Sequence, residues 1–261
     1  MAKWIIQKAF KVKPKLKNPI LVEGLPGVGN VGKIAIDYLV DTLKPELLYK
    51  IHSDVFPHSV FFNEYGYVEL PSVSIYRYKT KARDVLLLTG DVQPTRERAS
   101  YEFCQKILDF AEEVSCKEII TLGGIGLPNE VKKPVVFGAF TDKGTMDQYK
   151  KYGGINTKTA EKIEAIVGAS GLLIGLARLR DIKGVSLLSE TYAHEMHFGF
   201  REAKALLEKL QTILGLKLDL QDLEKEIQLS EDAAPMLHED RKSLKKQLRP
   251  MMDKVDLRYI G

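Results

Sequence analysis

Cysteine is nearly absent from this chain of 261 residues, which contains only Cys104 and Cys116. The two do not form a Cys-x-x-Cys pair, so the sequence excludes a disulfide scaffold and a cysteine-based metal framework, and it favours a reducing compartment. No apolar run approaches the roughly 18 residues of a membrane span; the longest begins at Gly168 and meets Arg178 within a dozen residues. The N-terminus turns polar after Ile6, unlike a secretory signal. We therefore expect a soluble, cytoplasmic protein.

The chain also has little excess charge of either sign. Its 39 lysine and arginine residues exceed its 35 acidic residues by four, too few to indicate a nucleic-acid-binding protein without a concentrated basic patch. An apolar share of 44% and a charged share of 28% are ordinary for a globular protein. At this length, folding buries about 70% of the surface of the extended chain. The composition thus excludes general disorder, and we expect neither a nucleic acid nor a membrane as partner.

Short apolar segments alternate with amphipathic ones in the first 215 residues. The predicted strands are 19–23, 85–89, 118–122 and 184–189, and the predicted helices are 31–43, 95–114 and 168–180. Continuous apolar strands that alternate with helices predict an α/β domain, with a mainly parallel sheet flanked by helices on both faces. Between them, residues 59–78 alternate apolar and polar side chains, which predicts antiparallel meander strands.

The last 46 residues, 216–261, differ in texture, with nine basic and ten acidic residues. Apolar residues recur there at spacings of three and four, the pattern of helices that pack on one another. Pro235 interrupts the pattern, so we expect two helices or a kinked one. The predicted seam consists of Leu220, Leu223, Ile227, Leu237, Leu244 and Leu248. We predict a core domain over 1–215 and a helical appendage over 216–261 that self-associates, or alternatively folds back on its own domain.

The most informative segment is the glycine-rich loop 24–33. Three of its glycines form G-x-G-x-x-G between a predicted strand and a predicted helix, the context of a dinucleotide-binding loop. The same segment matches the phosphate-binding pattern G-x-x-x-x-G-K, but Ile34 replaces the hydroxyl that holds magnesium. We favour an architectural role, in which glycines let a helix and a strand pack closely. The alternative is a nucleotide or nucleoside site formed by Gly27, Gly29, Gly32 and Lys33.

Other polar clusters do not assemble a catalytic set. Asp54 lies where a ribose-binding acid would be sought, but its surroundings predict a loop. His194 and His197 are spaced three apart rather than in the His-Glu-x-x-His pattern, and the sequence offers no third ligand. We therefore expect no catalytic residues, no metal and no cofactor.

Three segments resemble signatures of the proteasome-assembly-chaperone-2 family: residues 24–35, Leu122–Gly126 and Gly168–Ala177. The resemblance spans about residues 15–215 and continues into a charged helical tail, as in archaeal members. It implies an α/β fold related to nucleoside-phosphorylase-like folds, without established catalytic residues. It also implies a role in assembling the 20S proteasome, in which the chain forms homo-oligomers such as a tetramer or a pentamer.

The resemblance can be tested at the C-terminus, because proteasome-binding proteins often end in a hydrophobic residue, a tyrosine and any residue. Such an end inserts between neighbouring subunits of the proteasome ring. In this chain the tyrosine is third from last rather than second. The predicted partner-binding residues are Leu257, Tyr259, Ile260 and Gly261.

The expected function is that of a non-enzymatic, homo-oligomeric chaperone-like protein that binds 20S proteasome α subunits or another cytoplasmic protein. Two alternatives stay open. One is an enzyme that binds a nucleotide or nucleoside at residues 24–33. The other is an oligomeric adaptor that joins a different protein through its C-terminal helices.

Overall fold

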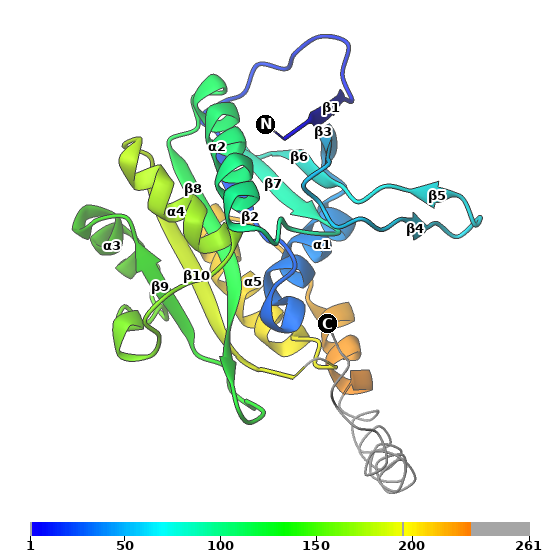
Figure 1. Cartoon of the computed structure of the whole chain (residues 1–261). Helices are drawn as coiled ribbons and strands as arrows, with labels where there is room; N and C mark the ends of the chain where they lie inside the picture. Colours follow the sequence, from blue (N-terminus) through cyan, green and yellow to red (C-terminus); the bar gives the residue numbers. More distant parts are fainter. Residues whose placement is uncertain (1, 195, 231–261) are drawn as a thin grey trace, which may run out of the picture. The chain divides into compact units, whose positions relative to one another are not determined.

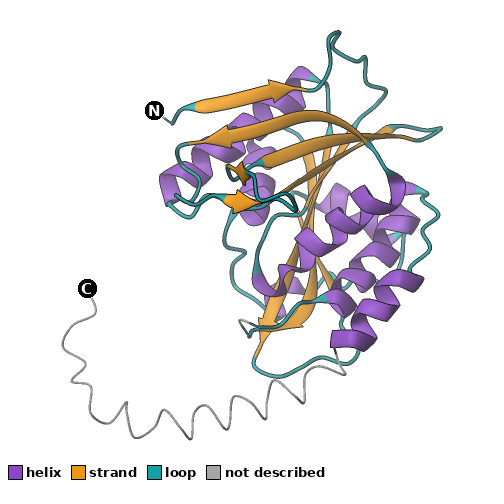
Figure 2. Ribbon diagram, turned by 90° about the vertical axis from the view of Figure 1, so that its right-hand side faces the viewer, coloured by secondary structure: helices purple, strands orange, loops and turns teal. Residues whose placement is uncertain are grey.

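The structure, a computed structural model, describes residues 2–194 and 196–230. One compact unit runs from Met1 to Leu218, and a second begins at Asp219. Of the second unit, which contains most of the predicted appendage, the structure describes a helix over residues 221–230. In the first unit, a twisted eight-stranded sheet lies between two layers of helices (Figures 1 and 2).

The sheet is mixed. Its strands lie in the order β1 (Trp4–Lys8), β3 (Glu46–Ser53), β6 (Val73–Lys79), β7 (Asp84–Gly90), β2 (Ile20–Glu23), β8 (Glu118–Leu127), β10 (Lys183–Tyr192) and β9 (Val136–Phe140). The four central strands from β7 to β10 pair in parallel, and the strands outside them pair antiparallel. The expectation of a mainly parallel sheet is thus confirmed for the centre only. At the edges, short connections such as the turn between β6 and β7 permit only antiparallel pairing.

Four long helices cover the sheet, and α2 (Glu97–Glu113) packs beside α4 (Ala169–Leu179) while α1 (Val31–Leu43) packs beside α5 (Phe200–Leu214). Alternate residues of a strand point to opposite faces. In β2, Leu21 belongs to the core that α2 and α4 share, whereas Ile20 and Val22 are fully buried outside that core cluster. The predicted helices 31–43, 95–114 and 168–180 are confirmed as α1, α2 and α4. None of the described helices has the length and apolar character to cross a bilayer.

Two regions differ from the predicted pattern. Residues 59–78 supply only β6 to the main sheet, because β4 (Phe61–Phe62) and β5 (Val68–Glu69) form a separate two-stranded hairpin. At the other edge, the short helix α3 (Lys143–Lys150) follows β9, and the side chain of Asp142 caps it by accepting a hydrogen bond from the Thr145 amide. The relation to nucleoside-phosphorylase-like folds stays a prediction.

Candidate functional site

The glycine-rich loop connects the end of β2 to the start of α1 and brings three backbone segments into direct contact. A Cβ atom on Gly24 would lie 2.1 Å from the carbonyl oxygen of Gly32, and one on Gly32 would lie 2.4 Å from the carbonyl oxygen of Leu122 in β8. A closely packed interior cannot absorb contacts this short. The glycines at these two positions therefore allow β2, α1 and β8 to approach one another.

The middle of the loop is covered by β10 and by the residues that precede α5. Gly29 has a φ of +62°, and a Cβ atom there would lie 2.7 Å from the hydroxyl oxygen of Thr191. The Gly199 amide donates a hydrogen bond of 2.8 Å to the Gly29 carbonyl. A Cβ atom on Gly124 of β8 would lie 2.6 Å from the Val28 carbonyl oxygen. Protein atoms thus occupy the space beside Gly29 and Gly124.

The four residues of the alternative nucleotide site do not converge. Gly27 is exposed and would accept a Cβ atom without any contact inside 4 Å, whereas Gly32 is buried against β8. The ammonium of Lys33 lies 2.6 Å from the Asp37 carboxylate, one turn further along α1, so its charge is already paired. This geometry favours the architectural role of the loop over the nucleotide site.

Glu23, the last residue of β2, is a fully buried carboxylate beside the glycine-rich loop. It is not among the residues predicted from the sequence. Its Oε1 atom accepts hydrogen bonds from the Leu25 amide at 3.1 Å and from the Ser170 hydroxyl at 3.3 Å. Its Oε2 atom has no partner among the residues that the structure describes. Burial raises the pKa of Glu23 to about 8, so the side chain is mostly protonated at neutral pH. The signal in the sequence that could have indicated Glu23 is an acidic residue at the end of an apolar strand, directly before the glycine-rich loop.

A second buried carboxylate fixes the segment that covers the loop. Glu202 lies in the first turn of α5, and its Oε1 atom accepts a hydrogen bond of 3.3 Å from the Thr191 hydroxyl. The same oxygen lies 3.1 Å from Nε2 of His197. No group of three or more His, Cys, Asp or Glu in the described part of the chain could hold a metal ion. The contacts of Glu202 therefore connect His197 and the start of α5 to β10.

The other predicted residues fall in three places. Asp54 lies in a loop, as predicted, and its Oδ1 atom accepts a hydrogen bond of 2.9 Å from the Lys3 amide. Leu223 and Ile227 lie on the helix over 221–230, and Leu220 directly precedes it. The remaining predicted seam and partner-binding residues lie outside the described residues; they are Leu237, Leu244, Leu248, Leu257, Tyr259, Ile260 and Gly261.

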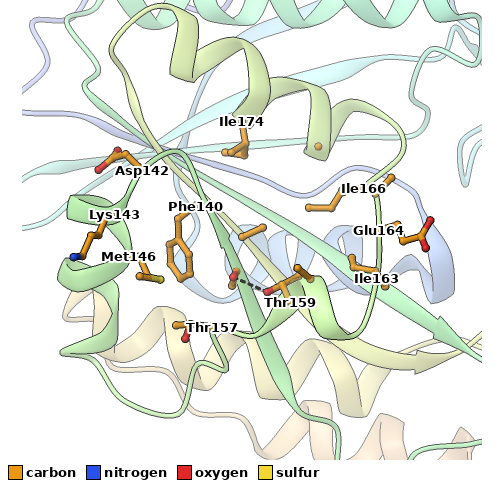
Figure 3. A pocket seen from close by; sticks show the side chains of 15 residues that line it. Phe140, Asp142, Lys143, Met146, Thr157, Thr159, Ile163, Glu164, Ile166 and Ile174 are labelled. Atoms are coloured by element: carbon orange, nitrogen blue, oxygen red, sulfur yellow. Dashed lines mark hydrogen bonds between the residues drawn. The ribbon is translucent and has the colours of Figure 1, made fainter.

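A cavity of about 700 Å³ lies elsewhere, between β9, α3 and α4, as Figure 3 shows. Phe140, Met146 and Ile163 contribute apolar surface to its wall. Two of its polar side chains already hold that wall together. The Thr159 hydroxyl donates to the Gly138 carbonyl at 2.6 Å, and Asp142 caps α3. Figure 3 shows two further polar side chains of the lining, Lys143 and Glu164, at opposite ends of the cavity, so its polar groups do not converge as in a catalytic site.

Comparison with known proteins identifies the family. A family model described as the PAC2 family matches residues 21–235. The chain belongs to the PAC2 family. The family membership expected from the three glycine-containing segments is therefore confirmed.

This PAC2-family chain is similar over its whole length to the uncharacterised protein MJ1210 of Methanocaldococcus jannaschii. The two are 28% identical over 263 residues, which cover 100% of this chain and 99% of MJ1210. Among solved structures, the chain is similar to PbaB of Pyrococcus furiosus, which is described as an archaeal proteasome activator. The two superpose with a TM-score of 0.84 at 33% sequence identity, and the superposition covers 91% of this chain and 100% of PbaB.

PbaA of the same organism, described as an archaeal homolog of proteasome-assembly chaperone, gives a TM-score of 0.73 at 24% identity. The superposition covers 94% of this chain and 98% of PbaA. At this identity the likeness shows that the two proteins share a fold.

The glycine contacts predict different costs for two substitutions in the same loop. Gly32→Ala should lower the free energy of unfolding by at least about 3 kcal/mol, because its methyl group forces α1 and β8 apart. Gly27→Ala should change that free energy by less than about 1 kcal/mol, because Gly27 has extended backbone and open space around it. Urea denaturation of both variants measures the difference. Equal losses would contradict the architectural role.

The buried carboxylate predicts a pH dependence of stability. Between an ordinary pKa of 4.5 and the folded-state pKa of about 8, the folded chain keeps a proton on Glu23 that the unfolded chain releases. The free energy of unfolding should therefore fall as pH rises through this interval. Glu23→Gln should remove this contribution and raise stability at pH 8 by roughly 4 kcal/mol. Denaturation midpoints at pH 5, 6, 7 and 8 provide the test, and an unchanged slope in Glu23→Gln would refute the assignment.

Proposed function

We propose that this PAC2-family chain is a non-enzymatic, homo-oligomeric cytoplasmic protein that binds the 20S proteasome and assists its assembly or activity. The observation that carries the proposal is the likeness to PbaB, which extends over all of PbaB at 33% identity. The geometry of the glycine-rich loop supports it, because protein atoms occupy the space beside Gly29. Recognition is then assigned to outer surfaces rather than to a cleft.

Several copies of one weak contact suffice for such a function. If the seam that begins at Leu220 joins copies of the chain, each assembly carries several C-terminal ends to a ring-shaped partner. Once one end is bound, the others act at a high effective concentration, so that modest single contacts give tight overall binding. We assign the contact with the proteasome to residues 257–261, whose apolar and aromatic side chains suit a pocket between ring subunits.

The C-terminal contact predicts a specific loss of binding. Deletion of residues 259–261 should weaken co-purification with the 20S proteasome of the same organism at least tenfold, while the oligomeric mass stays unchanged. Tyr259→Ala should reproduce most of this loss, and Tyr259→Phe, which keeps the ring, should retain binding. Undiminished binding by the deleted chain would assign the contact to another surface. Capture of a different protein in place of the proteasome would favour the adaptor function.

The seam predicts a change in mass. Removal of the residues after Gly215 should lower the number of copies in the assembly, because the predicted seam lies entirely beyond that point. Light scattering of the full and the shortened chain measures this directly. If the shortened chain forms assemblies with the same number of copies as the full chain, the seam does not join copies.

A further inference from the structure

The hairpin of β4 and β5 forms an arm, defined here as residues 59–70, which projects from the sheet between β3 and β6 (Figure 1). Only two pairs of residues form its ladder, Phe61 with Glu69 and Phe62 with Val68. Every residue of the arm is exposed except Asn63, which is half-buried. Its large apolar side chains are between 42% and 73% exposed: Val60, Phe61, Phe62, Tyr65, Tyr67, Val68 and Leu70.

The contacts that hold the arm are few and exposed. The Asn63 side chain accepts hydrogen bonds of 3.0 Å from the Tyr65 and Tyr67 amides, and Lys50 of β3 lies 3.5 Å from Glu69. Exposed polar contacts of this kind contribute little, and an isolated two-stranded hairpin is marginal in water. A surface that covers the apolar side chains of the arm would therefore stabilise it.

The area that the arm exposes is close to one side of a stable interface. Its four aromatic rings alone expose on the order of 500 Å², since an aromatic side chain covers roughly 200 Å². A standard interface buries about 800 Å² on each partner. Contiguous apolar patches of several hundred Å² on a protein surface mark sites of association.

An apolar groove of about 360 Å³ begins beside the root of the arm, between β1, β3 and α2. Trp4, Tyr49 and Phe103 are among the side chains that line it. Phe56, which precedes the arm, contacts two of these rings, with centroid distances of 6.1 Å to Trp4 and 6.3 Å to Phe103. The segment that leads into the arm thus packs on the aromatic rings that line the groove.

The charges of the two surfaces are complementary. The arm contains Glu64 and Glu69 and no lysine or arginine, and Glu69 pairs with Lys50 of its own chain, which leaves Glu64. The groove is lined by Lys8, Lys13, Lys106, Asp109 and Glu113. Its two acids are paired, Glu113 with Lys13 and Asp109 with Arg180, which leaves Lys8 and Lys106 without an acidic partner in the described part of the chain. An acidic, aromatic arm therefore suits this groove better than a basic segment would.

We propose that two copies of the chain exchange arms about a two-fold axis, with the arm of each copy in the groove of the other. Because arm and groove lie together, one two-fold operation brings both pairs of surfaces into contact at once, as a self-complementary interface requires. The inference rests on the homo-oligomer of the proposed function and identifies one of its interfaces.

The single tryptophan of the chain, Trp4, reports on the groove. The test compares the full chain with the triple variant Phe62→Ser/Tyr65→Ser/Tyr67→Ser, whose replaced side chains are 69% to 73% exposed and so do not support the fold. The variant should lower the mass per assembly by half, raise the dissociation constant of the arm interface at least tenfold, and increase acrylamide quenching of Trp4 fluorescence. Sedimentation velocity over a dilution series and quenching titrations provide these values.

The matched control is Val167→Ser/Leu179→Ser, which removes apolar side chains that are 92% and 80% exposed outside the arm and the groove. It should alter neither mass nor quenching. A triple variant with wild-type mass would overturn the arm interface, and a lower mass with unchanged quenching would overturn its placement in the groove. Either failure leaves proteasome binding by the tail intact, whereas a monomeric wild-type chain would refute the homo-oligomer itself.

Discussion

The close approach of three backbones at the glycine-rich loop is the constraint on which the centre of the fold depends. α1 starts directly against β2 and β8, and no side chain fits between the Gly24 and Gly32 backbones. Since β2 pairs in parallel with β7 on one side and β8 on the other, this contact fixes α1 against the parallel centre of the sheet. Two buried side chains beside the loop form hydrogen bonds within the protein: Glu23 accepts through Oε1 from Ser170, and Thr191 donates to Glu202.

This constraint separates two uses of one sequence pattern. In a dinucleotide-binding protein, the same spacing of glycines leaves room for a pyrophosphate at the helix N-terminus. In this chain, the Gly29 carbonyl is bonded to the Gly199 amide, and Thr191 lies against the turn. The pattern G-x-G-x-x-G thus indicates a tight turn and a close approach of backbone segments. Whether the loop also binds a ligand depends on which atoms occupy the space beside the turn. In this chain, those atoms belong to residues more than 150 positions away.

The same distinction explains what could be predicted from the sequence. The helix 31–43 was predicted with its observed bounds, because its apolar periodicity and its preceding glycines are local signals. The edge strand β1 and its neighbour β3 were missed, since partly exposed strands of mixed composition carry a weak pattern. The length of β8 was also underestimated, because Gly123 and Gly124 resemble a turn but continue the strand beside β10.

The candidate surfaces were harder to predict than the core. The alternation in residues 59–70 correctly indicated extended chain, but a local pattern does not show that the strands leave the main sheet and remain uncovered. Similarly, the burial of Glu23 depends on Ser170, which packs over it from α4. Long-range packing of this kind is absent from any single segment.

The central claim is that the glycine-rich loop is architecture and that recognition lies on protein surfaces. Calorimetric titration of the full chain with NAD, ATP and a nucleoside tests it most directly. The account predicts only heats of dilution for each compound up to millimolar concentration. Saturable binding of one molecule per chain at micromolar concentration would contradict it and assign the loop to a nucleotide-dependent enzyme.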